Sequence, residues 1–88
     1  MTFSVLFRPK AARSLRKLQR SFGTRIQESL KVLERSPEVG EQLKPSKFWE
    51  IRVGDYRVIY EIDKASNRVI VLFVGHRKNV YDEFSRLV

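Results

Sequence analysis

The chain has 88 residues, which is enough for one hydrophobic core and too few for two. Hydrophobic residues make up 42% of it and charged residues 32%, so the composition excludes a chain that stays disordered. The absence of Cys excludes disulfide bonds and thiolate metal sites. We therefore expect residues 1–88 to form a single domain.

The N-terminal segment has only a short apolar stretch before Arg8 and lacks the basic start and long apolar core of a secretory signal. No apolar run approaches the roughly 20 residues that a helix needs to cross a bilayer. We expect a cytoplasmic protein that does not bind a membrane.

Positive charge dominates the chain and is concentrated in one segment. The 18 Lys and Arg residues outnumber the 10 Asp and Glu residues, which gives a formal net charge of +8. Between Arg8 and Arg35, nine basic residues face two acidic ones, a net charge of +7. This distribution is typical of a nucleic-acid-binding protein, and an acidic protein partner would explain it equally well.

The first part of the chain predicts one strand and two helices. Residues 2–7 alternate in hydrophobicity, as a half-buried strand does. A helix follows from Pro9 to a C-cap at Gly23, and a second helix follows from Thr24 and closes at Ser36-Pro37. Both helices have one apolar face, formed by Ala11, Leu15, Leu18 and Phe22 in the first and by Ile26, Leu30 and Leu33 in the second.

The second part of the chain predicts three antiparallel strands and a short helix. Residues 37–46 are polar and contain two prolines, so we expect a loop there. Residues 48–53, 56–62 and 69–74 are rich in β-branched and aromatic residues, as strands are. A last helix begins with Asn79 as its N-cap and has an apolar stripe of Val80, Phe84 and Leu87. The expected fold class is α+β, in the order β-α-α-β-β-β with a short C-terminal helix, and a helical hairpin packs on one face of an antiparallel sheet.

A tight hairpin is predicted at Gly54-Asp55, where glycine takes the first position of a two-residue turn. This turn fixes the register and sets Arg52 opposite Arg57. Alternation along both strands then places six apolar residues on the face toward the helices: Trp49, Ile51, Val53, Tyr56, Val58 and Tyr60. The other face carries Glu50, Arg52, Arg57, Ile59 and Glu61.

Two arginines directly opposite each other repel across about 5 Å of sheet. Glu50 and Glu61 on the same face could neutralise them as a surface network. Alternatively, the pair could bind an anionic ligand, most naturally a phosphate held by the guanidinium groups. Arg77 leaves the last strand beside this hairpin, and Tyr81 follows four residues later. The hairpin alone does not choose between these two interpretations.

Residues 49–63 read WEIRVGDYRVIYEID, and residues 74–81 read VGHRKNVY. With these motifs the chain resembles the RelE branch of the RelE/ParE toxin superfamily, whose fold is microbial RNase-like, over essentially its whole length. The resemblance implies a ribosome-dependent messenger endoribonuclease that cleaves A-site codons without a metal or other cofactor. In such toxins the ribose 2′-OH attacks the adjacent phosphate. The implied partners are the ribosome, its mRNA and a cognate RelB-like antitoxin.

The resemblance also implies roles for individual residues. Arg57 would bind the scissile phosphate, and Arg77 would stabilise the transition state and donate a proton. Tyr81 would orient a nucleobase of the substrate. Arg52 falls where the family has a basic residue on the preceding strand. RNA binding is expected at Lys44, Lys47 and Lys78. The sequence predicts no metal site, because it has one His, no Cys and no close acidic cluster.

Glu50 departs from the family pattern, because ribonucleolytic members often carry a second basic residue there. By analogy with toxins that use a carboxylate, Glu50 is a candidate general base. An alternative function is that of the ParE branch, which inhibits DNA gyrase without cleaving RNA. A third interpretation, a regulator that only binds antitoxin or DNA through its basic helices, leaves the opposed arginines unexplained.

Overall fold

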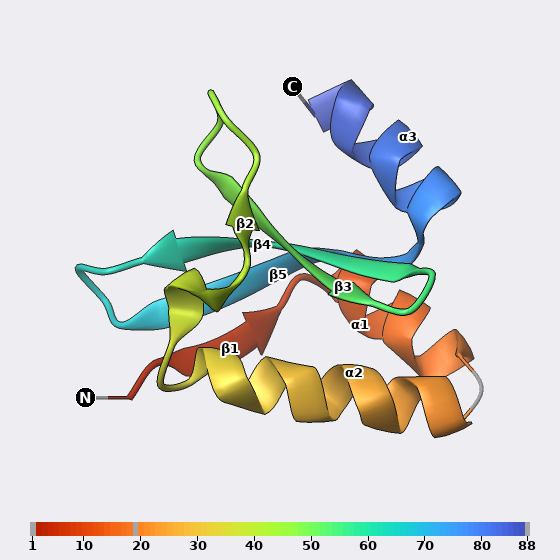
Figure 1. The fold of residues 1–88 in the computed structure, drawn as a ribbon, viewed down its shortest axis with the longest axis horizontal. Coiled ribbons are helices and arrows are strands. Elements are labelled where there is room, and N and C mark those ends of the chain that lie inside the picture. The colour runs from red at the N-terminus through yellow and green to blue at the C-terminus, as the bar shows by residue number, and fades with distance from the viewer. Residues whose placement is uncertain (1, 19, 88) are drawn as a thin grey trace.

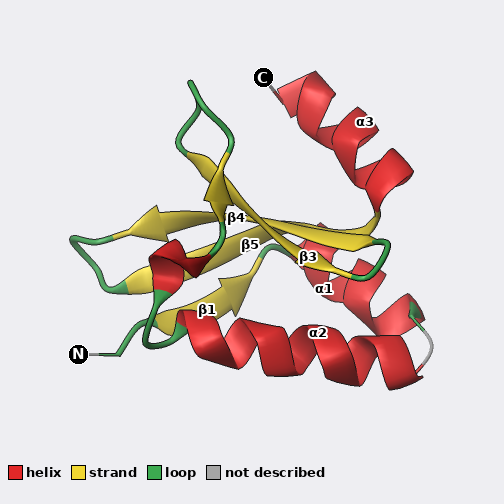
Figure 2. Ribbon diagram, viewed as in Figure 1, coloured by secondary structure: helices red, strands yellow, loops and turns green. Residues whose placement is uncertain are grey.

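Five strands and three α-helices build the fold of residues 2–18 and 20–87, which are the residues that the computed structural model describes, the side chain of Leu87 excepted. Figures 1 and 2 show the sheet in the middle of the molecule, with α1 and α2 on one side and α3 on the other. The elements in chain order are β1 (Ser4–Phe7), α1 (Pro9–Lys17), α2 (Arg20–Leu33), a 3-10 helix (Pro37–Val39), β2 (Glu41–Gln42), β3 (Phe48–Val53), β4 (Tyr56–Asp63), β5 (Arg68–His76) and α3 (Arg77–Leu87).

The sheet is mixed, and its strand order is β1-β5-β4-β3-β2. Strands β3, β4 and β5 pair antiparallel, as predicted, and β2 also pairs antiparallel with β3, but β1 pairs parallel with β5, with Val5 beside Val69. The prediction of a wholly antiparallel sheet is therefore wrong at this edge. Parallel neighbours need a long crossover connection, and α1, α2, β3 and β4 together supply it. Strand β5 is paired on both sides, which agrees with its continuous apolar sequence.

The helices divide at a different residue from the predicted one. Helix α1 ends at Lys17, because Leu18 is already extended at φ −74° and ψ 152°. Gly23 and Thr24 therefore lie inside α2, and the predicted caps at these residues are wrong. An internal glycine costs a helix only about 1 kcal/mol, so it does not have to end one. Phe22 then lies on α2, where its ring is 4.9 Å from that of Tyr56.

Two clusters of buried residues lie on opposite faces of the sheet. The larger one packs the apolar faces of α1 and α2 against the strands, with Ala11, Ile26 and Leu33 fully buried. It contains all six hairpin residues that alternation assigned to this face. The smaller cluster joins α3 to the opposite face through Phe48, Ile59 and Val80, and the ring of Phe84 meets that of Phe48 edge-on at 5.5 Å. The second face therefore has apolar cover at one end only.

The predicted loop at residues 37–46 contains a 3-10 helix and the two-residue strand β2, which pairs with β3. The Tyr60 hydroxyl donates a hydrogen bond of 2.8 Å to the Pro37 carbonyl oxygen, which fixes this segment to the core. Gly40 allows the close approach, because a Cβ at this position would lie 2.5 Å from the Glu50 carbonyl oxygen and from the Tyr60 hydroxyl. A strand of two residues has no periodicity that the sequence could reveal.

Helix α3 follows β5 without a turn, so the predicted N-cap at Asn79 is wrong. Strand β5 continues to His76, and the Arg77 backbone N–H donates to the Asp55 carbonyl oxygen at 3.0 Å, which attaches the helix start to the hairpin turn. Val80 and Phe84 face the sheet as predicted, and the side chain of Leu87 lies outside the described residues. Among the described residues, no helix has the length and apolarity to cross a membrane.

Candidate active site

The β3–β4 hairpin has the register that its turn predicts. Arg52 lies opposite Arg57, and Val53 lies opposite Tyr56. Gly54 has φ +61°, which is the left-handed conformation that the first position of a type II′ turn requires. The arginine pair and Glu50 therefore share the sheet face that α3 partly covers, while the apolar hairpin residues contact α1 and α2.

Arg57 is held rigidly, which is unusual for an arginine. Only 8% of the residue is exposed. Its Nη1 donates to the carbonyl oxygens of Gly54 at 2.7 Å and Tyr56 at 2.9 Å. Its Nε approaches the Tyr81 hydroxyl at 3.4 Å. These contacts fix the guanidinium plane and leave Nη2 without a hydrogen bond to any residue in 2–18 or 20–87.

Glu50 lies between the two arginines. Its Oε1 is 3.2 Å from Arg52 Nε and 4.0 Å from Arg57 Nε. Its side chain is 2% exposed, and Oε2 is enclosed without a hydrogen-bond partner among the described residues. The hydrogen bond to Glu50 raises the pKa of the Arg52 guanidinium. The predicted neutralising network is therefore present at Glu50 but not at Glu61, whose carboxylate pairs with Lys47 Nζ at 3.2 Å.

Arg52 and Arg57 differ in exposure, although they lie opposite each other. The Arg52 side chain is 62% exposed and reaches Glu41 on β2 at 3.9 Å. Sequence reasoning missed Glu41, because nothing in its neighbourhood predicts a strand. A hollow of about 340 Å³ lies beside the pair, between the segment at Gly40 and Glu41 and strand β3, and its lining includes Glu50 and Arg52.

Helix α3 contributes the two other predicted catalytic residues. Tyr81 is 37% exposed, so its ring remains available to a ligand while its hydroxyl contacts Arg57. Arg77 is the first residue of the helix, and its exposed side chain leaves from the end of the hairpin, where Gly75 pairs with Arg57. The structure brings Tyr81 into contact with Arg57 and brings only the backbone of Arg77 to the hairpin.

The three predicted RNA-binding lysines lie at two ends of this face. Lys78 is exposed in the first turn of α3, near Arg77. Lys44 and Lys47 lie in the loop before β3, and Lys47 is 5.7 Å from the Phe48 ring centre. At about 3.3 Å per strand residue, Lys47 lies roughly 16 Å from Arg52 along β3. The lysines therefore flank the arginines rather than join them.

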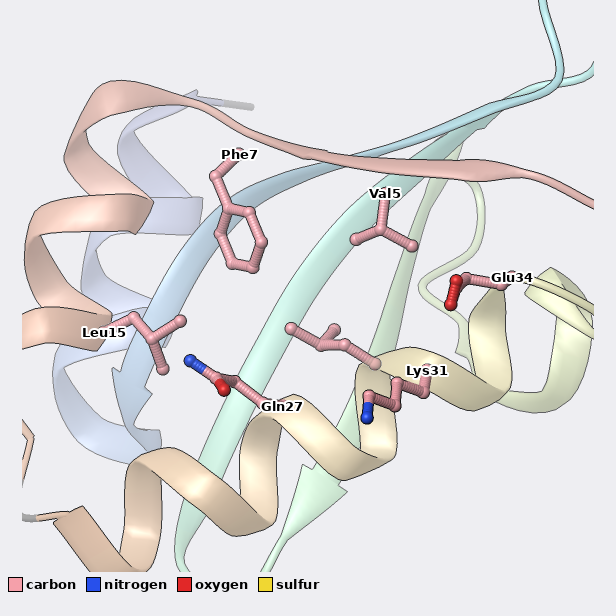
Figure 3. A pocket seen from close by; sticks show the side chains of 7 residues that line it. Val5, Phe7, Leu15, Gln27, Lys31 and Glu34 are labelled. Carbon is pink, nitrogen blue, oxygen red and sulfur yellow. The ribbon is translucent and has the colours of Figure 1, made fainter.

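This face offers cations, a tyrosine and the carboxylates of Glu50 and Glu61. Within residues 2–18 and 20–87, no three His, Asp or Glu side chains converge as metal ligands do. A hollow of about 250 Å³ lies elsewhere, between β1 and the helices, and Figure 3 shows Val5, Phe7 and Leu15 pointing into it. That hollow is on the opposite side of the sheet from Arg57. The arginine face is suited to binding an anion and stabilising negative charge.

The comparisons with known proteins agree with this architecture. The model of the ParE toxin of the type II toxin-antitoxin system parDE matches residues 5–81. The chain belongs to this toxin family. It is a toxin of a type II toxin–antitoxin system, within the RelE/ParE superfamily that its hairpin motif resembles.

Relatives of this family member carry RelE-type names. Toxin RelG of Mycobacterium tuberculosis is 33% identical over 85 residues, which cover 92% of this chain and 98% of that protein. The crystal structure of the toxin–antitoxin complex RelBE2 from M. tuberculosis matches with a TM-score of 0.78 and 32% identity, over 88% of this chain and 93% of the other. A mutant of the E. coli toxin RelE in the free state matches over all of both chains with a TM-score of 0.82, and at 23% identity it shows the shared fold alone.

Proposed function

We propose that this toxin is a ribosome-dependent endoribonuclease that cleaves mRNA in the A site. The observation that carries the proposal is the buried Arg57 guanidinium, which three contacts orient while Nη2 makes no hydrogen bond to the described part of the chain. A guanidinium fixed in this way needs no reorganisation when it meets a phosphate, and preorganised charge is the main source of stabilisation for a transition state that gains negative charge. The 33% identity to toxin RelG supports the same branch.

The proposed reaction is an attack of the ribose 2′-OH on the adjacent phosphorus. The 2′-OH loses its proton to solvent water, and its oxygen bonds to phosphorus as the bond from phosphorus to the 5′ oxygen breaks, which leaves a 2′,3′-cyclic phosphate and a 5′-hydroxyl. Arg57 binds the phosphate through the Nε–Nη2 edge of its guanidinium, and Arg52 neutralises charge on the other side of it. Arg77 stabilises the transition state and donates a proton to the leaving oxygen, while Tyr81 orients a nucleobase of the mRNA with its exposed ring.

Glu50 is poorly situated as the general base in this conformation. Its side chain is 2% exposed, and its free oxygen Oε2 is enclosed, so a ribose hydroxyl has no path to it. A base has to lie within hydrogen-bond reach of the proton that it removes. A catalytic role for Glu50 as a base would therefore require the carboxylate to move.

RNA outside the scissile phosphate would be bound by the flanking lysines, Lys44, Lys47 and Lys78. The exposed basic residues between Arg8 and Arg35 would contact ribosomal RNA phosphates, for which their net charge of +7 is suited. The proposed inhibitor is a RelB-like antitoxin, because the matched M. tuberculosis structure is a toxin–antitoxin complex. Acting on ribosomes, the toxin would work in the cytoplasm.

A translation extract tests this proposal. Purified toxin added to translating ribosomes should give cuts in mRNA that are phased with the codons, and the same RNA without ribosomes should stay intact. Arg57→Ala should slow the cutting by about 100- to 1,000-fold. An intact message on ribosomes, or undiminished cutting by Arg57→Ala, would refute the proposal.

Gyrase inhibition is the second candidate, and two observations favour it. The matching family model is that of the ParE toxin, and Glu50 already neutralises the arginine pair that would bind RNA. The contact between Tyr81 and Arg57 favours the RNase instead, because it joins α3 to the anion site. A gyrase supercoiling assay separates the two candidates: inhibition of supercoiling with ribosomal mRNA left intact would establish the gyrase inhibitor.

A further inference from the structure

The Glu50 carboxylate occupies the position where an anion would bind. It lies on the same strand face as Arg52, two residues along β3, and diagonal to Arg57 on β4. Its Oε1 is within 3.2 Å of one guanidinium nitrogen and 4.0 Å of the other. These are the nitrogens that a bound phosphate oxygen would also approach.

The Glu50 carboxylate accepts fewer hydrogen bonds than a buried carboxylate needs. A buried carboxylate is costly unless all its acceptor positions are satisfied. Oε2 is enclosed and has no partner among the described residues, and the Oε1 contact with Arg57 is longer than a hydrogen bond. Glu50 is therefore held mainly by charge and by one hydrogen bond from Arg52, whose own side chain is 62% exposed.

We propose that Glu50 is a resident anion, a carboxylate that fills the Arg52–Arg57 site in the free toxin and is displaced when a phosphate binds. The proposal rests on the proposed function only in taking phosphate as the competing anion. Glu50 then acts through the two arginines: it keeps the charge of the buried Arg57 compensated until the RNA arrives, and it lowers the affinity of the free site for phosphate.

The displaced carboxylate would enter a hollow along strand β3, onto which the enclosed Oε2 does not open in the free toxin. The hollow of about 340 Å³ between the segment at Gly40 and strand β3 is lined by Glu50 itself and by Arg52. Glu41 also lines this hollow and lies 3.9 Å from Arg52, so Arg52 has a second carboxylate partner after Glu50 moves. The exposed Arg52 can follow either anion, whereas Arg57 stays fixed by its backbone contacts.

Titration with inorganic phosphate tests the proposal on the whole toxin, without ribosomes. The Nε–H resonances of Arg52 and Arg57 in NMR spectra report binding at this site. Glu50→Gln preserves the shape of the side chain and removes its charge, so it should bind phosphate at least tenfold more tightly than the wild type. Glu61→Gln is the matched control, because Glu61 lies on the same face and pairs with Lys47 instead. Its phosphate affinity should stay within about twofold of the wild type, because its charge lies away from the two arginines.

Equal or weaker phosphate binding by Glu50→Gln would overturn the proposal, and so would an equal gain in Glu61→Gln. A second measurement uses the wild type, so its result does not depend on whether the variants fold. As phosphate saturates the Arg57 Nε–H signal, the ¹³C resonance of the Glu50 carboxylate should shift with the same midpoint, and an unmoved resonance would also overturn it. Failure of RNA cleavage leaves these results unaffected, so the two proposals fail separately.

Discussion

The β3–β4 hairpin and the segment from Arg8 to Arg35 both carry positive charge, but they differ in how far that charge is buried. In the hairpin, Arg57 is 8% exposed and is held by two carbonyl oxygens and the Tyr81 hydroxyl. On α1, α2 and their flanks, all nine basic residues between Arg8 and Arg35 are exposed. Of these nine, Lys10 makes a described ion pair, with Glu83 at 2.8 Å.

This difference separates local chemistry from long-range attraction. A buried charge in fixed geometry acts strongly on one nearby phosphate, because little water screens it. Exposed charges act together over about 10 Å and are screened by salt. We therefore expect the hairpin to determine the rate of cleavage and the helical surface to determine affinity for the ribosome.

The largest effect is expected at Arg57. Arg57→Ala should lower the cleavage rate on ribosomes by about 100- to 1,000-fold, because loss of one preorganised contact to the transition state costs about 2.7–4 kcal/mol. Arg16→Ala on α1 is the matched control and should lower the rate less than threefold. Rates at saturating ribosome concentration measure both. Similar losses in the two variants would remove the distinction between the regions.

Substitutions at two glycines test how tightly the chain is packed beside β3 and inside α2. Gly40→Ala should lower the free energy of unfolding by about 3 kcal/mol, since its Cβ would lie 2.5 Å from a backbone oxygen and a buried hydroxyl. Gly23→Ala inside α2 should raise it by about 0.5–1 kcal/mol, because the added Cβ would lie 4.0 Å from the Leu15 carbonyl oxygen, without a clash, and alanine favours the helix. Urea denaturation measures both. A destabilised Gly23→Ala would contradict the reassigned helix boundary.

Tyr60 tests the buried side of the hairpin through pH. Burial raises the pKa of the Tyr60 hydroxyl to about 12. The pKa of tyrosine in the unfolded chain is about 10, so the folded protein holds this proton more tightly. The resulting contribution to the free energy of unfolding is complete below pH 10. About 2 kcal/mol of it is lost as the pH rises from 10 to 12. Tyr60→Phe should be about 1 kcal/mol less stable than the wild type at pH 8, because it loses the bond to Pro37, and should lack this part of the alkaline loss. If the free energies of unfolding of the wild type and Tyr60→Phe fall equally between pH 10 and 12, this account is refuted.

The smallest effects are expected on the helical surface. Each of Arg13→Gln, Arg16→Gln and Lys17→Gln should weaken ribosome binding severalfold at most, and the slope of log K against log salt should fall by about 0.7–1 for each cation that contacts a phosphate. Binding measured across a salt series gives this slope. A slope that stays the same in the triple variant would exclude these residues from the ribosome contact.

The sequence predicted the hairpin well because local rules determine it. Val53-Gly54-Asp55-Tyr56 fixes the register, and alternation then assigns every side chain to a face. The helix boundary was wrong because Gly23 is compatible with both a cap and a helix interior, and the packing of Phe22 on Tyr56 decides between them. The parallel pairing of β1 was missed for a similar reason, since it depends on contacts far apart in the chain.

The sequence predicted which residues form the candidate site, but it did not predict how their charges are paired and buried. Spacing placed Arg52 opposite Arg57 and brought Tyr81 near them. The burial of Glu50 depends on the packing around β3, and the position of Glu41 depends on a strand of two residues, so neither leaves a periodic signal. The catalytic roles of Arg52, Arg57, Arg77 and Tyr81, and the RNA-binding roles of the three lysines, stay predictions.

The central claim is that the hairpin arginines promote attack by a ribose 2′-OH. The most direct test uses ribosomes programmed with an mRNA that carries a single 2′-deoxy nucleotide at the cleavage position. We predict that the all-ribose message is cut to a 2′,3′-cyclic phosphate and a 5′-hydroxyl, and that the substituted message stays intact. Cleavage of the substituted message, or an uncut all-ribose message, would contradict the account.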